Sequence, residues 1–268
     1  MSAGRCAALP VFLVACALVA GADSNATQQT PASAPRSEAF VVLRGFGYSG
    51  AGERAIKALE PAMAAQGMDL YIPDYISRSG LDDSRKKLQQ IMQERGMTRY
   101  ERVHVFAFIA GGWTVNPLAA AGGIPKLATV IYDRSPLQER APRVADENLH
   151  FLTWVRYGAP VFDLARTPYS PLIAPGVKVG LVVETSPTEF IRDHEKAARS
   201  YGPFRFECDA FNQRHDDCIY VDMNHDELYV RFAEVWPEAL SLIRSGRFSS
   251  AARRTAPAGD PFAPRPRQ

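Results

Sequence analysis

Asp133 and His225 are the two residues of this chain whose types best suit acid–base chemistry, and each stands at the predicted end of a strand. An imidazole that is oriented by a carboxylate can act as a general base and take a proton from water. Two simpler interpretations stay open. Asp133 could form a local ion pair with Arg134, and His225 could be a buried residue without a function.

A second stretch has the form of a reactive turn but lacks a reactive atom. The apolar run 103–108 leads into Ile109-Ala110-Gly111-Gly112, where small residues favour a sharp turn between a buried strand and a helix. Ile109 stands at the top of this turn, and a hydrocarbon side chain can neither attack a carbonyl group nor receive a proton. No serine, cysteine or aspartate lies between Val103 and Gly112. The turn is therefore predicted to have an apolar floor.

The elements that would position these residues alternate between strand and helix through residues 38–247. This pattern predicts an α/β domain with a mostly parallel sheet and helices on both faces. The predicted strands are 39–43, 68–72, 103–108, 127–132, 177–183 and 218–222. The predicted helices are 53–66, 82–95, 111–121 and 227–243. Residues 133–176 lack a simple strand pattern, and we interpret them as an insertion over the carboxyl edge of the sheet.

The order of these parts resembles the α/β-hydrolase family, on four stretches that each follow a predicted strand. They are Leu43-Arg44-Gly45-Phe46-Gly47, Ala107-Phe108-Ile109-Ala110-Gly111-Gly112, Gly180-Leu181-Val182-Val183-Glu184-Thr185-Ser186-Pro187 and His225-Asp226-Glu227-Leu228. In the family these stretches carry, in turn, oxyanion donors, the nucleophile, the triad acid and the catalytic histidine. The resemblance implies a hydrolase fold with a cap-like insertion at 133–176.

Two of the three triad positions depart from the family. Ile109 stands at the nucleophile position and Ser186 at the usual acid position, so only His225 remains. Because the triad acts as a unit, this loss predicts a protein without serine-hydrolase activity. Some members of the family place the acid after the preceding strand, which would make Asp133 the partner of His225.

Three functions follow from this pattern. The leading hypothesis is that the former active-site cleft binds a small, partly apolar ligand or a protein partner. The positions expected to line that cleft are Arg44, Gly45, Phe46, Tyr48, Phe108, Ile109, Ala110 and Ser186. An alternative is a hydrolase with a displaced mechanism in which His225, with Asp133, is the base. Another is a structural or interaction protein whose cleft is filled by its own side chains.

The N-terminus predicts export. Arg5, the apolar run 7–19 and Ala20-Gly21-Ala22 have the order of a signal peptide spanning 1–22. A lipobox-like stretch that ends at Cys16 leaves a lipoprotein open as an alternative. The polar residues 23–37 are interpreted as a spacer, and residues 248–268 as a disordered tail. We therefore expect a periplasmic or secreted protein, with a membrane anchor only if Cys16 carries lipid.

Cysteine use and charge limit the remaining classes. Cys208 and Cys218 are the cysteines left after cleavage, and in an oxidising compartment they are a candidate disulfide. A net charge of +2 with dispersed basic residues gives no reason to expect nucleic-acid binding. The acidic loop at His215-Asp216-Asp217 matches no zinc or calcium spacing, so neither a metal nor a cofactor is expected.

Overall fold

A computed structural model describes residues 36–46 and 48–263 of the chain. Six strands form one parallel sheet in the order β2-β1-β3-β4-β5-β6. They are β1 (Glu38–Leu43), β2 (Met68–Tyr71), β3 (Arg102–Ala107), β4 (Leu127–Arg134), β5 (Lys178–Glu184) and β6 (Asp217–Val221). Each strand lies within two residues of its predicted bounds, because strands buried on both faces are continuously apolar.

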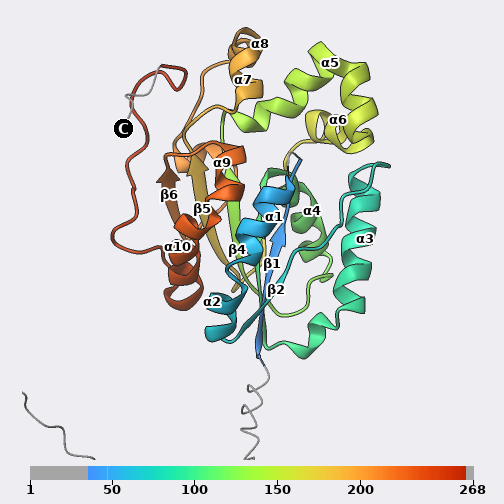
Figure 1. Cartoon of the computed structure of the whole chain (residues 1–268), viewed down its shortest axis with the longest axis vertical. Coiled ribbons are helices and arrows are strands. Elements are labelled where there is room, and N and C mark those ends of the chain that lie inside the picture. Colours follow the sequence, from blue (N-terminus) through green and yellow to red (C-terminus); the bar gives the residue numbers. More distant parts are fainter. Residues whose placement is uncertain (1–35, 47, 264–268) are drawn as a thin grey trace, which may run out of the picture. The chain divides into compact units, whose positions relative to one another are not determined.

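Helices cover both faces of this sheet (Figure 1), which confirms the predicted α/β class. One face carries α1 (Gly50–Lys57), α2 (Glu60–Ala65), α9 (His225–Val230) and α10 (Phe232–Ser245). The other carries α3 (Leu81–Glu94), α4 (Ile109–Ala120), α7 (Glu189–Asp193) and α8 (Glu195–Ser200). Short 3-10 turns occur at Met97–Arg99, Gln138–Arg140 and Cys208–Phe211.

Two of the predicted helices are interrupted. The segment 53–66 is divided into α1 and α2, and Pro61 stands in the first turn of α2, where its missing N–H needs no partner. The segment 227–243 is divided into α9 and α10, with Arg231 between them. The apolar periodicity continues across both interruptions, so it could not reveal them.

The insertion, in which no element was predicted, is helical. It contains α5 (Ala141–Tyr157) and α6 (Ala159–Arg166), which lie beyond the carboxyl ends of the strands (Figure 1). Leu149 has non-helical backbone angles, so α5 is kinked there. The kink interrupts the period of the apolar residues, and this is why the sequence pattern did not predict a helix.

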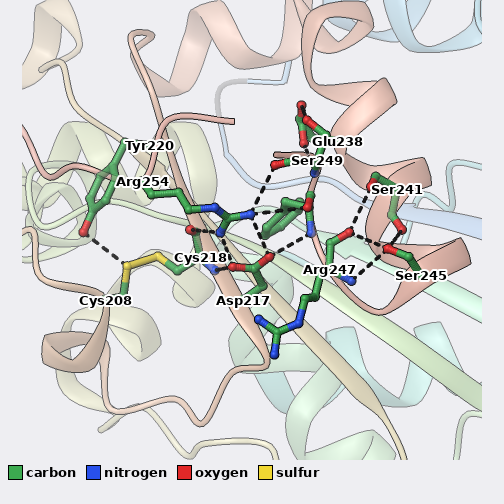
Figure 2. Close-up of polar contacts among 11 residues, drawn as sticks. Cys208, Asp217, Cys218, Tyr220, Glu238, Ser241, Ser245, Arg247, Ser249 and Arg254 are labelled. Atoms are coloured by element: carbon green, nitrogen blue, oxygen red, sulfur yellow. Dashed lines mark hydrogen bonds and ion pairs between the residues drawn. A yellow bond between two sulfur atoms is a disulfide. The ribbon is translucent and has the colours of Figure 1, made fainter. Parts of the chain in front are cut away.

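The expected disordered tail makes specific contacts up to residue 263. Phe248 is buried, and its N–H donates to Asp217 Oδ2 at 2.8 Å. Figure 2 shows Arg254 bound to the same carboxylate. Tyr220 donates its N–H to the carbonyl of Arg253 at 2.9 Å, so the segment lies along the outer edge of β6. The expectation of disorder is wrong for these residues, because one buried carboxylate holds a segment that composition alone marks as unstructured.

The predicted disulfide between Cys208 and Cys218 is confirmed, with an S–S distance of 2.00 Å (Figure 2). Within the described residues, every helix is too short or too polar to cross a bilayer. The predicted signal peptide, Cys16 and nearly all of the spacer fall in residues 1–35, outside the part of the chain that is described.

Candidate functional site

A cavity of about 680 Å³ opens at the carboxyl edge of the sheet, beneath the insertion helices. Its floor includes Ile109, Ala110 and His225, and α5 and α6 supply much of its wall. Among the apolar residues that line it are Phe46, Leu149, Leu152, Val161, Leu164 and Val230. The volume falls within the range of roughly 300–1,000 Å³ that is usual for small-molecule sites.

The floor is built by the predicted turn after β3. Phe108 has extended backbone angles and precedes Ile109, the first residue of α4. Gly111 lies so close to β1 that a Cβ atom would come within 2.9 Å of Leu43. The glycine is thus required for the helix to pack on the strand, as the sequence indicated.

Ile109 occupies this turn without backbone strain. Among the described residues other than glycine, only Lys126 and Asn212 have a positive φ. A β-branched residue at positive φ would be a costly outlier, whereas the family's elbow holds its nucleophile in a strained turn. The isoleucine therefore stands on a relaxed version of the elbow, with a side chain that is 6% exposed.

His225 is held at the start of α9 by local sequence. Asn224 caps the helix and Glu227 completes a capping box, so the backbone at His225 is fixed. Its Nδ1 lies 2.8 Å from Asp133 Oδ2 and 3.2 Å from Glu184 Oε1. The pairing of His225 with Asp133 stands in the structure, and both carboxylates are fully buried.

The two acids govern the protonation of this cluster. Burial by itself would lower the pKa of His225, but the charges of Glu184 and Asp133 outweigh it and raise that pKa well above its ordinary value. Burial, and then the charge of Asp133, raise the pKa of Glu184 well above its usual range. The cluster therefore keeps its protons to a higher pH than the same groups would in water. An imidazolium has no lone pair with which to act as a base.

Tyr229 occupies the position next to the other ring nitrogen. Its hydroxyl accepts a hydrogen bond from the Gly45 N–H at 2.8 Å and lies 3.4 Å from His225 Nε2. The ring stacks on Phe108 with centroids 3.9 Å apart. Burial raises the pKa of Tyr229 well above its ordinary value, so the phenol stays protonated. The N–H that resembled an oxyanion donor is thus used within the protein.

Several expected lining residues lie elsewhere. Arg44 forms an ion pair with Asp74 and does not line the cavity. Tyr48 packs edge-on against Tyr229 at 5.2 Å, and burial raises its pKa to about 12. Ser186 is buried outside the cavity lining. Of the eight expected positions, Phe46, Ile109 and Ala110 line the cavity, while Gly45 and Phe108 contact Tyr229 beneath it.

Sequence reasoning missed Glu184 and Tyr229. Glu184 ends an apolar strand, and an acid at the last position of a doubly buried strand is itself a signal. The resemblance to the family points instead to the loop that follows, where Ser186 stands. Tyr229 lies four residues after His225, so one helix face presents both side chains. The signal was therefore present in the helical spacing.

The chain resembles solved structures in fold alone. No family model and no curated protein matches the sequence. The lipase BlEst2 of Bacillus licheniformis aligns with a TM-score of 0.51 at 14% identity, over 80% of this chain and 94% of the lipase. A bromoperoxidase of Bacillus anthracis aligns with a TM-score of 0.45 at 13% identity, over 78% and 92% of the two chains. The sheet order, the turn at Ile109, the position of His225 and the similarity to the lipase together show that this chain has the α/β-hydrolase fold.

Proposed function

We propose that this protein is an α/β-hydrolase-fold protein without serine-hydrolase activity, which binds a small and largely apolar molecule in the former active-site cleft. The observation that carries the proposal is an open cavity of about 680 Å³ with Ile109 at the position where the family has its nucleophile. Burying an apolar ligand there gains about 25 cal/mol for each Å² removed from water. A filled cleft, as a purely structural role would have, is not supported by a cavity of this size.

One leucine and one valine on α5 provide a matched test of this proposal. Leu152 is 63% exposed and lines the cavity, whereas Val155 is 50% exposed on the same helix and does not line it. The probe is N-phenyl-1-naphthylamine, whose fluorescence rises in apolar surroundings. L152D is expected to weaken its binding about 10-fold, which corresponds to about 1.4 kcal/mol, and V155D to leave it unchanged. Equal effects of the two substitutions would contradict the proposal, as would failure of the wild-type protein to bind the probe.

A displaced hydrolytic mechanism is the second candidate, supported by the 2.8 Å contact between His225 and Asp133. It requires His225 to act as a base, and the charges of the two acids oppose this because they raise the pKa of the ring and so favour its protonated form. We expect no hydrolysis of p-nitrophenyl butyrate above that of H225Q. Turnover in the wild-type protein that H225Q abolishes would establish this mechanism and exclude the non-catalytic one.

We also propose that the protein is exported, with residues 1–22 removed. The disulfide between Cys208 and Cys218 supports this, because disulfides persist in oxidising compartments. Mass spectrometry of the mature N-terminus is expected to find Asp23 as the first residue. An acylated Cys16 at the N-terminus would show a lipoprotein instead.

A further inference from the structure

The cluster beneath the cavity brings three metal-ligating side chains together from three elements. Asp133 lies near the end of β4, Glu184 ends β5 and His225 begins α9. One ligand atom from each side chain can be chosen so that all three lie within 4.8 Å of one another. The side chains of the two acids are fully buried, and that of His225 is 4% exposed.

The oxygens of the two acids are poorly satisfied for groups so deeply buried. The Nδ1 of His225 hydrogen-bonds Glu184 Oε1 at 3.2 Å and lies 2.8 Å from Asp133 Oδ2, so one nitrogen serves two buried carboxylates. Among the described residues, neither oxygen of Asp133 has a hydrogen-bond partner, and neither does Glu184 Oε2. Buried polar atoms are normally paired, so unpaired carboxylate oxygens that face a shared point indicate a missing partner.

A second buried acid shows what a satisfied site looks like in the same fold. Glu38, which is 4% exposed and close to His104, receives Arg102 and Arg244. In the described residues, no lysine or arginine forms an ion pair with Asp133 or Glu184. Arginine supplies the positive charge beside Glu38, whereas no such side chain of the described residues does so beside Asp133 or Glu184.

We propose that Asp133, Glu184 and His225 form a binding site for one divalent first-row metal ion, for which zinc is the probe. A dication with two carboxylates and a neutral imidazole is electrically neutral, which removes the cost of buried net charge. One nitrogen and two oxygen ligands suit zinc, and three protein ligands leave a position for water or another ligand. The spacing of the three residues in the sequence gives no hint of this site. The proposal does not depend on the apolar ligand.

Zinc content tests the site directly. The purified full chain is stripped with EDTA, dialysed against zinc chloride and then against buffer, and its metal is measured by mass spectrometry. We expect about one zinc per wild-type chain and a loss of at least 10-fold in the D133N/E184Q double variant. H215Q is the matched control and should keep its zinc, because His215 lies in the separate acidic loop with Asp209 3.9 Å away.

Two further measurements keep the result independent of folding defects. Zinc should raise the melting temperature of the stripped wild-type protein, because a ligand of the folded state stabilises it, and should not raise that of the double variant. Cobalt substitution should give visible d–d absorption that disappears in H225Q. Wild-type protein that retains no zinc, or a double variant that retains as much as wild type, would overturn the proposal. Loss of zinc in H215Q would place the metal in the acidic loop instead.

Discussion

Asp217 begins β6 and Asp133 lies near the end of β4 in the same parallel sheet, and both are buried, but their surroundings differ. The carboxylate of Asp217 receives Arg254, the Phe248 N–H and the N–H of Cys218. That of Asp133 has His225 Nδ1 at 2.8 Å and no ion pair with a lysine or arginine of the described residues. We call the first group, with the disulfide of Cys218, the edge clamp, and the group of Asp133, Glu184 and His225 the cavity cluster.

The difference separates a site that joins two segments of the chain from the site that we propose binds a metal ion. Arg254 and the Phe248 N–H bind Asp217 and so tie the C-terminal segment to β6, the outermost strand, whose free edge would otherwise be exposed to pairing with another chain (Figure 2). The cavity cluster joins three elements under an open cavity and leaves oxygens unpaired. Buried polar groups without partners cost stability, so their presence beneath a pocket indicates a function that uses them.

The largest expected contrast is between the two isosteric substitutions D217N and D133N. D217N should lower the free energy of unfolding by about 3 kcal/mol, because a buried carboxylate with a charged partner is lost. D133N should lower it less, by about 1 kcal/mol, because Glu184 stays beside His225 as a second carboxylate that can take the charge. Urea denaturation of both variants in EDTA measures the difference. Equal losses would mean that the two sites do not differ in the way described.

Removal of the disulfide should also destabilise the edge clamp. The double substitution C208A/C218A is expected to cost about 2–3 kcal/mol, because the bridge closes a short loop in the unfolded chain. The cavity cluster should be unaffected. Zinc binding and probe binding by the variant are the controls, and a loss of either at a temperature where the variant is folded would contradict the separation of the two regions.

Stability should depend on pH in opposite directions in the two regions: the contribution of the cavity cluster is lost as pH rises, and that of the edge clamp is lost as pH falls. The pKa values of His225 and Glu184 are raised in the folded state, which therefore holds protons that the unfolded state releases. Stability should fall as pH rises, from about 4.3 upward for Glu184 and from about 6.5 upward for His225. Arg254 and two backbone N–H groups hold the pKa of Asp217 below its usual value despite its burial, so its contribution is lost as pH falls through that lowered value.

Each proton involved should contribute a slope of up to about 1.4 kcal/mol per pH unit. Denaturation between pH 6 and pH 9 in EDTA measures it for wild type and E184Q, and the variant should show the smaller slope. Tyr229 lies beside the same ring and stays protonated over this range, since burial raises its pKa well above its ordinary value. A stability that rises between pH 7 and pH 9 would contradict the assignment of protons.

The smallest expected effect concerns Tyr229. Y229F leaves the Gly45 N–H without its acceptor and should cost about 1 kcal/mol. The stacking of the ring on Phe108 is retained, so the fold should be unchanged. Thermal denaturation measures the loss, and Y48F is the control, because the hydroxyl of Tyr48 is buried without a partner and its removal should not destabilise.

The sequence by itself determined the strands, their parallel arrangement and the turn with Ile109 at its top. These depend on local composition: continuous apolar runs and small residues at a close approach. The disulfide could also be predicted, because few cysteines remained. The insertion helices and the ordered C-terminal segment could not, since a kink at Leu149 and a contact with Asp217 leave no periodic pattern.

Only the tertiary structure decided which acid faces His225. Asp133 and Glu184 are separated by 51 positions in the sequence, and their meeting depends on the adjacency of β4 and β5 in the sheet. The same holds for Tyr229, whose hydroxyl reaches Gly45 across 184 positions. The protonation of the cluster, the cavity volume and the unpaired oxygens all depend on distance and burial. Packing, and no local pattern, sets the distances between residues that are remote in sequence.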